Sequence, residues 1–235
     1  MSNIVPLNSV THRALRVDAA VSARYGDNQR FVAVIVDEFP LLAVHCPLFF
    51  SKDANTGAFY CGAMLGFDAG ENLFLDGGRE TCRPLNLQRG PFLAAGDDIA
   101  IDLDNPRVGA ERGEPLFAEN GEPSAYLKSI IRLFRELVPG LERTKAFIAT
   151  LLSLKLVEPV DIDVAFDDGS RRDVTGLYTV NHEALRGLPD ADVVALFRRG
   201  YLNLIYLMIA SLKQVPVLAQ KKNRSFAAGL SLSHA

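Results

Sequence analysis

The hydrophobic period of this chain changes once along its length, and that change constrains the fold more than any other feature of the sequence. Up to about Pro106 the apolar residues come in short runs interrupted by Gly, Pro, Asn and Asp, as strands with tight turns require. From residue 124 onward they recur with the spacing of about 3.6 residues that is typical of amphipathic helices. The sequence therefore predicts an α+β fold with a β-rich first half. The expected strands lie in the runs 31–39, 41–50, 57–67, 72–75 and 98–104.

Two helices are expected at the start of the second half. The segment 124–138 carries one apolar stripe, and Pro139-Gly140 should end that helix because Pro cannot donate a hydrogen bond and Gly accepts a left-handed cap. A second helix follows and ends before Pro159. Helices joined so tightly should pack as an antiparallel pair.

A β-hairpin and a long helix are expected after that pair. Two alternating runs flank residues 167–170 (Asp-Asp-Gly-Ser), which indicates a hairpin over 157–180, because the turn needs a positive φ. Asn181 should cap a short helical turn. A long core helix should then extend over 191–214.

These elements divide the chain into four parts. The Gly-, Pro- and charge-rich middle segment reads as a linker or a long surface loop, and the small, aperiodic residues at the end read as a flexible tail. The alternative is one continuous domain over 1–220. The four expected parts are a β-rich region 1–107, a linker 108–123, a helical region with its hairpin 124–220, and a tail 221–235.

Composition excludes several classes of protein. With 49% apolar and 23% charged residues, the chain is too apolar to be disordered. Its net charge of −3 offers no bulk positive field for nucleic acid. The most apolar stretch, 200–212, is shorter than the roughly 20 residues of a bilayer span, and the N-terminus lacks a signal-peptide core. We therefore expect a soluble, cytoplasmic protein with no membrane span and no nucleic-acid partner.

The cysteines and histidines carry few chemical motifs. Cys46, Cys61 and Cys82 cannot all pair and form no C-x-x-C, so the simplest interpretation is a reducing compartment. The histidines are scattered without a zinc-binding spacing, and no phosphate-binding loop or nucleophile elbow occurs. No metal and no cofactor is predicted. Cys82 lies between Arg79 and Arg83, whose charges favour a reactive thiolate; the alternative is a packed thiol.

Three carboxylates lie on one face of the expected strand 98–104. Asp98, Asp102 and Asp104 could bind a hard cation or shuttle protons, because carboxylates serve both purposes. The more common explanation of such alternation is the solvent-facing side of a half-buried strand.

Three arginines form the second candidate site. Arg83, Arg89 and Arg107 each lie beside a Pro or Gly in chain without helical period. A guanidinium in such a loop can bind a carboxylate through two hydrogen bonds, so an anionic peptide end is a conceivable ligand. The alternative, which we favour, is that these arginines tie loops to the three carboxylates of the 98–104 strand.

Short motifs along nearly the whole chain resemble the bacterial SapC family. The segment Gln88-Arg89-Gly90-Pro91-Phe92, which follows an Asn-Leu-Phe element, is fairly specific. The others are Val5-Pro6-Leu7, Asp37-Glu38-Phe39, Pro47-Leu48-Phe49-Phe50, Leu65-Gly66-Phe67, Glu71-Asn72-Leu73-Phe74, Ile101-Asp102, Asp168-Gly169, Gly176-Leu177-Tyr178 and the stretch from Leu196 to Leu218.

The resemblance implies the biological system in which the protein acts, but it assigns no catalytic residues. The family name comes from surface-array (S-layer) systems, and its members are often encoded beside TonB-dependent receptors, halogenase-like proteins and cupin-like hydroxylases. Our leading hypothesis is a soluble, non-catalytic accessory protein that binds a peptide or protein partner in such a system. The alternatives are an enzyme that modifies a peptide or small metabolite, using the three carboxylates or Cys82, and a structural S-layer subunit.

Overall fold

The computed structural model describes residues 3–75, 82–96, 98–111 and 113–232, and it confirms the α+β class. It divides into two compact units, each made of two segments of the chain. The first unit comprises Met1–Asn28 and Leu85–Gly140, and the second comprises Gln29–Pro84 and Leu141–Ala235. Each unit thus joins an early segment of the chain to a later one, and the four consecutive parts expected from the sequence stay a prediction.

The first unit contains two small antiparallel sheets. β7 (Asp98–Asp102) lies between β1 (Ile4–Pro6) and β6 (Phe92–Ala95), with Val5 opposite Ile101 and Phe92 opposite the same residue. β2 (Arg16–Val17) pairs with β8 (Glu114–Pro115). The short helices α2 (Leu85–Gln88) and η1 (Ala23–Tyr25) complete this unit, together with the first part of the long helix α3 (Ala125–Ser153).

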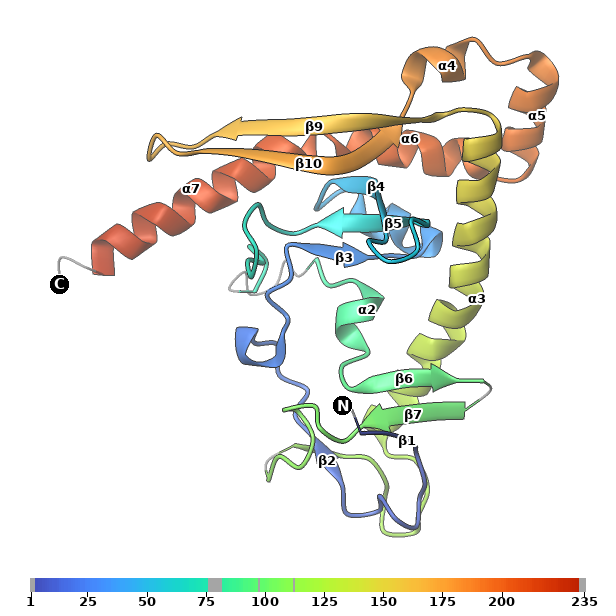
Figure 1. Ribbon diagram of the computed structural model, residues 1–235. Coiled ribbons are helices and arrows are strands. Elements are labelled where there is room, and N and C mark those ends of the chain that lie inside the picture. Colours follow the sequence, from blue (N-terminus) through green and yellow to red (C-terminus); the bar gives the residue numbers. More distant parts are fainter. Residues whose placement is uncertain (1–2, 76–81, 97, 112, 233–235) are drawn as a thin grey trace. The chain divides into compact units, whose positions relative to one another are not determined.

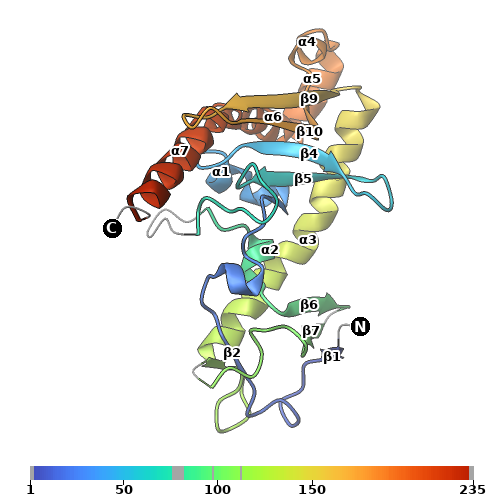
Figure 2. The same ribbon diagram turned by 60° about the vertical axis from the view of Figure 1, so that its left-hand side comes forward.

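The second unit is built around a five-stranded antiparallel sheet in the order β3-β5-β4-β10-β9. Figure 2 shows four of these strands, β9, β10, β4 and β5, following one another from the top downward. The buried Phe50 of β4 packs against Phe147 of α3, with ring centroids 6.2 Å apart. The strands are β3 (Phe31–Ala33), β4 (Leu48–Lys52), β5 (Phe59–Met64), β9 (Val157–Ala165) and β10 (Arg171–Val180).

The predicted hairpin and its turn are confirmed. β9 and β10 pair from Arg171–Ala165 to Val180–Val157, and Gly169 has the positive φ of 82° that the turn needs. The Asp168 side chain accepts hydrogen bonds from the backbone and the hydroxyl of Ser170, which stabilises the turn. Asn181 caps α4 (His182–Arg186) as expected, by accepting from the backbone N–H of Ala184.

The apolar run 31–39 is not the single strand that the sequence predicted. β3 ends at Ala33, and the chain turns into η2 (Val36–Glu38) and α1 (Phe39–Leu42). Pro40 in the first turn of α1 cannot donate a strand hydrogen bond, and the Glu38 carboxylate accepts from the backbone N–H of Ile35 at 3.0 Å. Local capping therefore overrides the strand propensity of the run. The run 72–75 is also not a strand, and Leu73 and Phe74 lie in a turn.

The predicted end of a helix at Pro139-Gly140 is wrong. α3 (Ala125–Ser153) continues for 29 residues with Pro139 inside it, so the expected antiparallel pair does not form. Its buried positions stay in phase across the proline: Leu133 and Leu137 before it, and Phe147 and Leu151 after it. Pro139 itself is exposed. Packing of one continuous face thus outweighs the helix-breaking residues. The boundary between the two units falls within this helix, after Gly140.

The long core helix predicted over 191–214 is broken into two helices. α5 (Asp190–Arg198) ends before Gly200, whose φ of 73° is a left-handed conformation that an ordinary helix does not contain. α6 (Tyr201–Ser211) follows and lies along the β9–β10 ribbon in Figure 1. α7 (Gln214–Leu232) takes in most of the segment that the sequence analysis expected to be a flexible tail.

One stretch of the described chain satisfies the length and composition of a membrane-crossing helix. It covers Tyr201–Phe226, has a mean hydropathy of 1.5, and is 22% buried within the protein. Core helices of water-soluble proteins satisfy the same criterion. The apolar run 200–212 forms only part of this stretch, and the absence of a membrane span stays a prediction.

Candidate functional site

Arg107 is buried in the first unit and serves as an internal anchor. Its guanidinium donates to the Asp27 carboxylate at 2.6 Å and to the carbonyl oxygens of Asp18 and Ala20 at 3.0 and 2.6 Å. It also lies over the Tyr25 ring, 4.4 Å from the ring centroid. The Arg107 side chain is only 3% exposed, so its guanidinium is engaged by residues inside the protein.

The other two arginines predicted to bind a ligand do not share that environment. Arg89 donates to the carbonyl oxygen of Phe92 at 2.7 Å, and burial lowers the pKa of its guanidinium. Arg83 belongs to the second unit, whereas Arg89 and Arg107 belong to the first. Our favoured alternative, in which arginines hold the carboxylates of the 98–104 segment, is wrong for Arg107, which pairs with Asp27.

The three carboxylates of the 98–104 segment do not converge on one site. Asp98 is exposed at the start of β7, while Asp102 accepts the backbone N–H of Asp104, and Asp104 accepts that of Asn3. Within the described residues none of the three forms an ion pair. Asp98 alone borders a cavity of about 410 Å³ in the first unit, which is otherwise lined mainly by apolar side chains such as Leu127.

Cys82 is buried beside a second thiol. Its Sγ lies 2.8 Å from the Sγ of Cys46, and the two side chains are 3% and 0% exposed. Contact with the Cys82 thiol and burial together raise the pKa of Cys46 above its ordinary value. Arg79, one of the two arginines expected to activate Cys82, lies outside the described residues.

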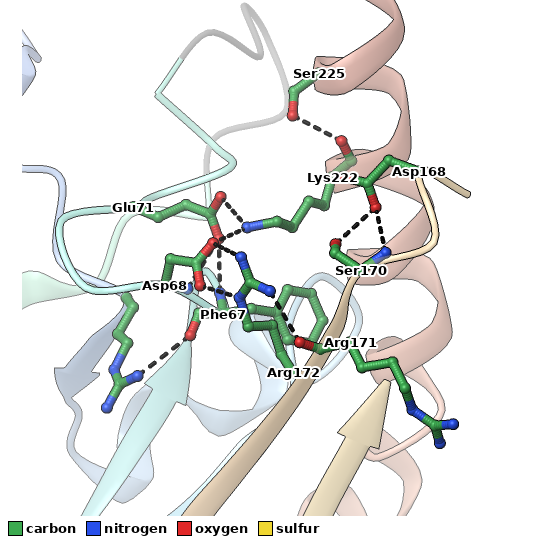
Figure 3. Close-up of polar contacts among 10 residues, drawn as sticks. Phe67, Asp68, Glu71, Asp168, Ser170, Arg171, Arg172, Lys222 and Ser225 are labelled. Carbon is green, nitrogen blue, oxygen red and sulfur yellow. Dashed lines mark hydrogen bonds and ion pairs between the residues drawn. The ribbon is translucent and has the colours of Figure 1, made fainter. Parts of the chain in front are cut away.

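A cluster of four charged side chains joins α7 to the sheet of the second unit (Figure 3). Lys222 of α7 is 2% exposed and donates to Asp68 and to Glu71, with 2.8 Å between Nζ and Glu71 Oε1. Arg172 of β10 donates to the other oxygen of Asp68 at 2.5 Å. The Lys222 ammonium also lies 5.4 Å from the centroid of the Phe166 ring.

The backbone around this cluster fixes the position of its acids. The Glu71 carboxylate accepts the backbone N–H groups of Phe67 and Asp68 at 2.7 and 3.2 Å. Gly66 is required there, because a Cβ would lie 2.8 Å from the Glu71 carbonyl oxygen. With two cations and two carboxylates the cluster is electrically balanced, and we interpret it as the ionic anchor of α7.

The second unit also holds a larger hollow, which we call the α1–α6 pocket. Its volume is about 640 Å³, and its charged residues are Asp37, Arg143 and Arg199. Arg143 binds both carboxylate oxygens of Asp37, at 2.9 to 3.2 Å, and so neutralises it. The remaining lining residues are Val36, Pro40, Gly200, Tyr201 and Leu204.

Arg199 is the uncompensated charge of this pocket. Its side chain is exposed and makes no hydrogen bond or ion pair with any residue that the structure describes. Sequence reasoning missed Arg199 because it placed the residue inside one continuous helix. Gly200, directly after a pair of arginines, was the available signal, since Gly commonly follows the end of a helix.

Comparison with known proteins gives one positive result. The family model described as SapC matches residues 7–218 of the chain. The chain belongs to the SapC family. Neither the curated proteins nor the solved structures contain a match to this SapC protein. Among the residues described, no group of three or more His, Cys, Asp and Glu side chains is placed to hold a metal ion.

Proposed function

We propose that this SapC-family protein is a non-catalytic accessory protein that binds a carboxylate-bearing, apolar segment of a peptide or partner protein in the α1–α6 pocket. The observation that carries the proposal is Arg199, an unpaired guanidinium beside a hollow of about 640 Å³. Arginine binds carboxylates through two parallel hydrogen bonds, so its free donors favour a carboxylate as the occupant.

The charge balance of the pocket supports an anionic ligand. Asp37 is the single acid among the lining residues, and Arg143 already pairs with it. Arg199 is therefore left as a net positive charge, and Arg198, also exposed, adds to it at the end of α5. An anionic group entering here gains attraction without displacing an existing partner.

Exposed apolar side chains lie close in sequence to the lining residues and support an apolar occupant. Leu41, next to the lining residue Pro40, is 67% exposed. Phe197 is 72% exposed, and its carbonyl accepts the backbone N–H of the lining residue Gly200. Large exposed apolar groups beside an arginine are typical of protein-binding surfaces.

The pocket wall is held in place before any ligand arrives. Tyr201 packs edge to face on the buried Phe147, with 5.3 Å between ring centroids. The backbone N–H of Val36 donates to the Thr144 hydroxyl at 2.9 Å, which fastens η2 to α3. A wall that is already ordered loses little conformational entropy on binding.

The biological setting of this binding is proposed from the family alone. We infer that the partner belongs to a surface-layer or TonB-dependent uptake system, with halogenase-like and cupin-like neighbours as further candidates, and that binding takes place in the cytoplasm. The enzymatic alternative needs its acids and Arg89 to line one pocket. Asp98 borders the cavity of about 410 Å³ in the first unit, but Arg89 is not among the residues that line that cavity, so no specific observation favours the enzymatic alternative.

Fluorescence anisotropy with two peptide mixtures tests the proposal. One mixture contains labelled hexapeptides that end in Leu with a free carboxylate, and the other contains the same peptides as C-terminal amides. We expect the free acids to bind at least about tenfold more tightly, because the amide loses a charge-assisted hydrogen bond. Arg199→Ala should remove the difference, whereas the exposed Arg135→Ala control should retain it. Equal binding of acids and amides would overturn the proposal.

A photo-crosslinking residue at position 197 identifies the partner in the source organism. A crosslinked protein counts as support when the crosslink is lost in Arg199→Ala and kept in Arg135→Ala. A crosslink that is unaffected by Arg199→Ala would place the partner elsewhere on the surface and contradict the pocket.

A further inference from the structure

The thiol pair of Cys46 and Cys82 is distinct from the α1–α6 pocket and has its own chemistry. Cys46 follows α1, and its backbone N–H donates to the Leu42 carbonyl oxygen at 2.9 Å. Cys82 comes from a segment 36 positions later in the chain, and its sulfur lies 2.8 Å from that of Cys46. The third thiol, Cys61, lies in β5 and has no sulfur contact among the described residues.

The separation of the two sulfurs places a covalent bond within reach. A disulfide bond is about 2 Å long, and its formation between groups already in contact needs a movement of less than about 1 Å. Both side chains are buried, so the surrounding packing holds them together. We infer that Cys46 and Cys82 form an intramolecular disulfide when the protein is exposed to a hydroperoxide such as hydrogen peroxide.

The reaction balances in two steps. The Cys82 thiolate attacks one oxygen of the peroxide, the O–O bond breaks, and hydroxide leaves with the proton to give water and a sulfenic acid on Cys82. The Cys46 sulfur then attacks the sulfenic sulfur, the S–O bond breaks, and a second water leaves. Two thiols lose two electrons and two protons in total, and one peroxide becomes two water molecules.

The structure also indicates the order of attack. Cys46 is completely buried, and contact with the Cys82 thiol, together with burial, raises its pKa, which makes Cys46 the less favourable first nucleophile. Cys82 is the more exposed of the two, although only slightly, and hydrogen peroxide is small enough to reach it through local opening. Cys82 is therefore the first nucleophile and Cys46 the resolving thiol.

The cross-link should stabilise the second unit. It closes a loop of about 35 residues that contains β4, β5 and the acids of the Lys222 cluster. Closing a loop of that size restricts the unfolded chain, which corresponds to a rise in Tm of about 8–15 °C for a chain of this length.

Intact-mass spectrometry of the reduced full-length protein, before and after hydrogen peroxide, tests the inference. We expect wild type to lose the mass of two hydrogen atoms, with peptide mapping that links Cys46 to Cys82 and finds Cys61 free. The Cys61→Ala control should behave as wild type. Cys46→Ala should instead accumulate a dimedone-reactive sulfenic acid at Cys82, because the resolving thiol is gone.

Three outcomes would overturn the inference: added oxygen on wild type without loss of hydrogen, a cross-link that involves Cys61, or a disulfide between two molecules. The peptide map and the melting temperature of the wild-type protein distinguish these outcomes. The test therefore remains valid even if a cysteine variant folds poorly.

Discussion

Arg107 and Asp27 form a buried ion pair that joins two distant parts of the first unit. The Nη2–Oδ2 distance is 2.6 Å, and the side chains are 3% and 5% exposed. Further hydrogen bonds from Arg107 to the carbonyl oxygens of Asp18 and Ala20 leave its charge well solvated by the protein. Arg107, a ligand-binding candidate in the sequence, thus holds the 18–27 segment in place inside the first unit.

Removing this pair should destabilise the first unit strongly. Arg107→Ala leaves the Asp27 carboxylate buried without its cation, and we expect a loss of about 3–5 kcal/mol in the free energy of unfolding. Urea unfolding followed by circular dichroism measures the loss. Arg24→Ala is the matched control, because its ion pair with Asp18 lies at the surface, where water screens the attraction, and its loss should have a much smaller effect. Equal effects of the two substitutions would contradict the anchoring role.

The ionic anchor of α7 should make the thermal stability of the protein depend on pH in the acid range. Hydrogen bonds from Arg172 and from Lys222 lower the pKa of Asp68 below its ordinary value in the folded protein. This stabilisation is complete above the unfolded pKa of about 3.9 and is lost as the pH falls through the lower folded-state value. We therefore expect Tm to fall between pH 5 and pH 2, which are approximate limits set by that pKa.

Asp68→Asn should flatten this pH dependence, since it removes the titrating group. Thermal melting across the acid range measures the effect for wild type and variant. The control is Asp161→Asn, an exposed acid on β9 without an ion pair among the described residues, which should leave the wild-type profile unchanged. A profile that stays steep in Asp68→Asn would assign the acid sensitivity to another group.

Replacing the proline inside α3 should stabilise the protein. Pro139 is exposed and has no N–H with which to complete the hydrogen bonding of the helix. Pro139→Ala supplies that donor and a better helix former, and we expect a gain of about 1–2 kcal/mol in the free energy of unfolding. Thermal melting checks the gain, with the neighbouring exposed Val138→Ala as control. A lower Tm for Pro139→Ala would show that α3 needs the proline where it stands.

Local signals predicted those elements that local interactions control. The turn at Gly169 needs a positive φ, and the cap at Asn181 needs one side-chain acceptor, so a few adjacent residues suffice for both. Local signals wrongly predicted the end of a helix at Pro139-Gly140, because the buried face of α3 continues in phase on both sides of these residues.

By itself the sequence determined the α+β class, the hairpin with its turn and cap, and membership of the SapC family. These features depend on periodicity and motifs, which are formed by residues close to one another in the sequence. Only the tertiary structure decided the partners. Asp27 meets Arg107, Cys46 meets Cys82, and Lys222 meets Asp68 and Glu71 across 36 to 154 positions of chain. Such pairs form because packing brings distant segments of the chain together, and no local sequence pattern predicts which segments will meet.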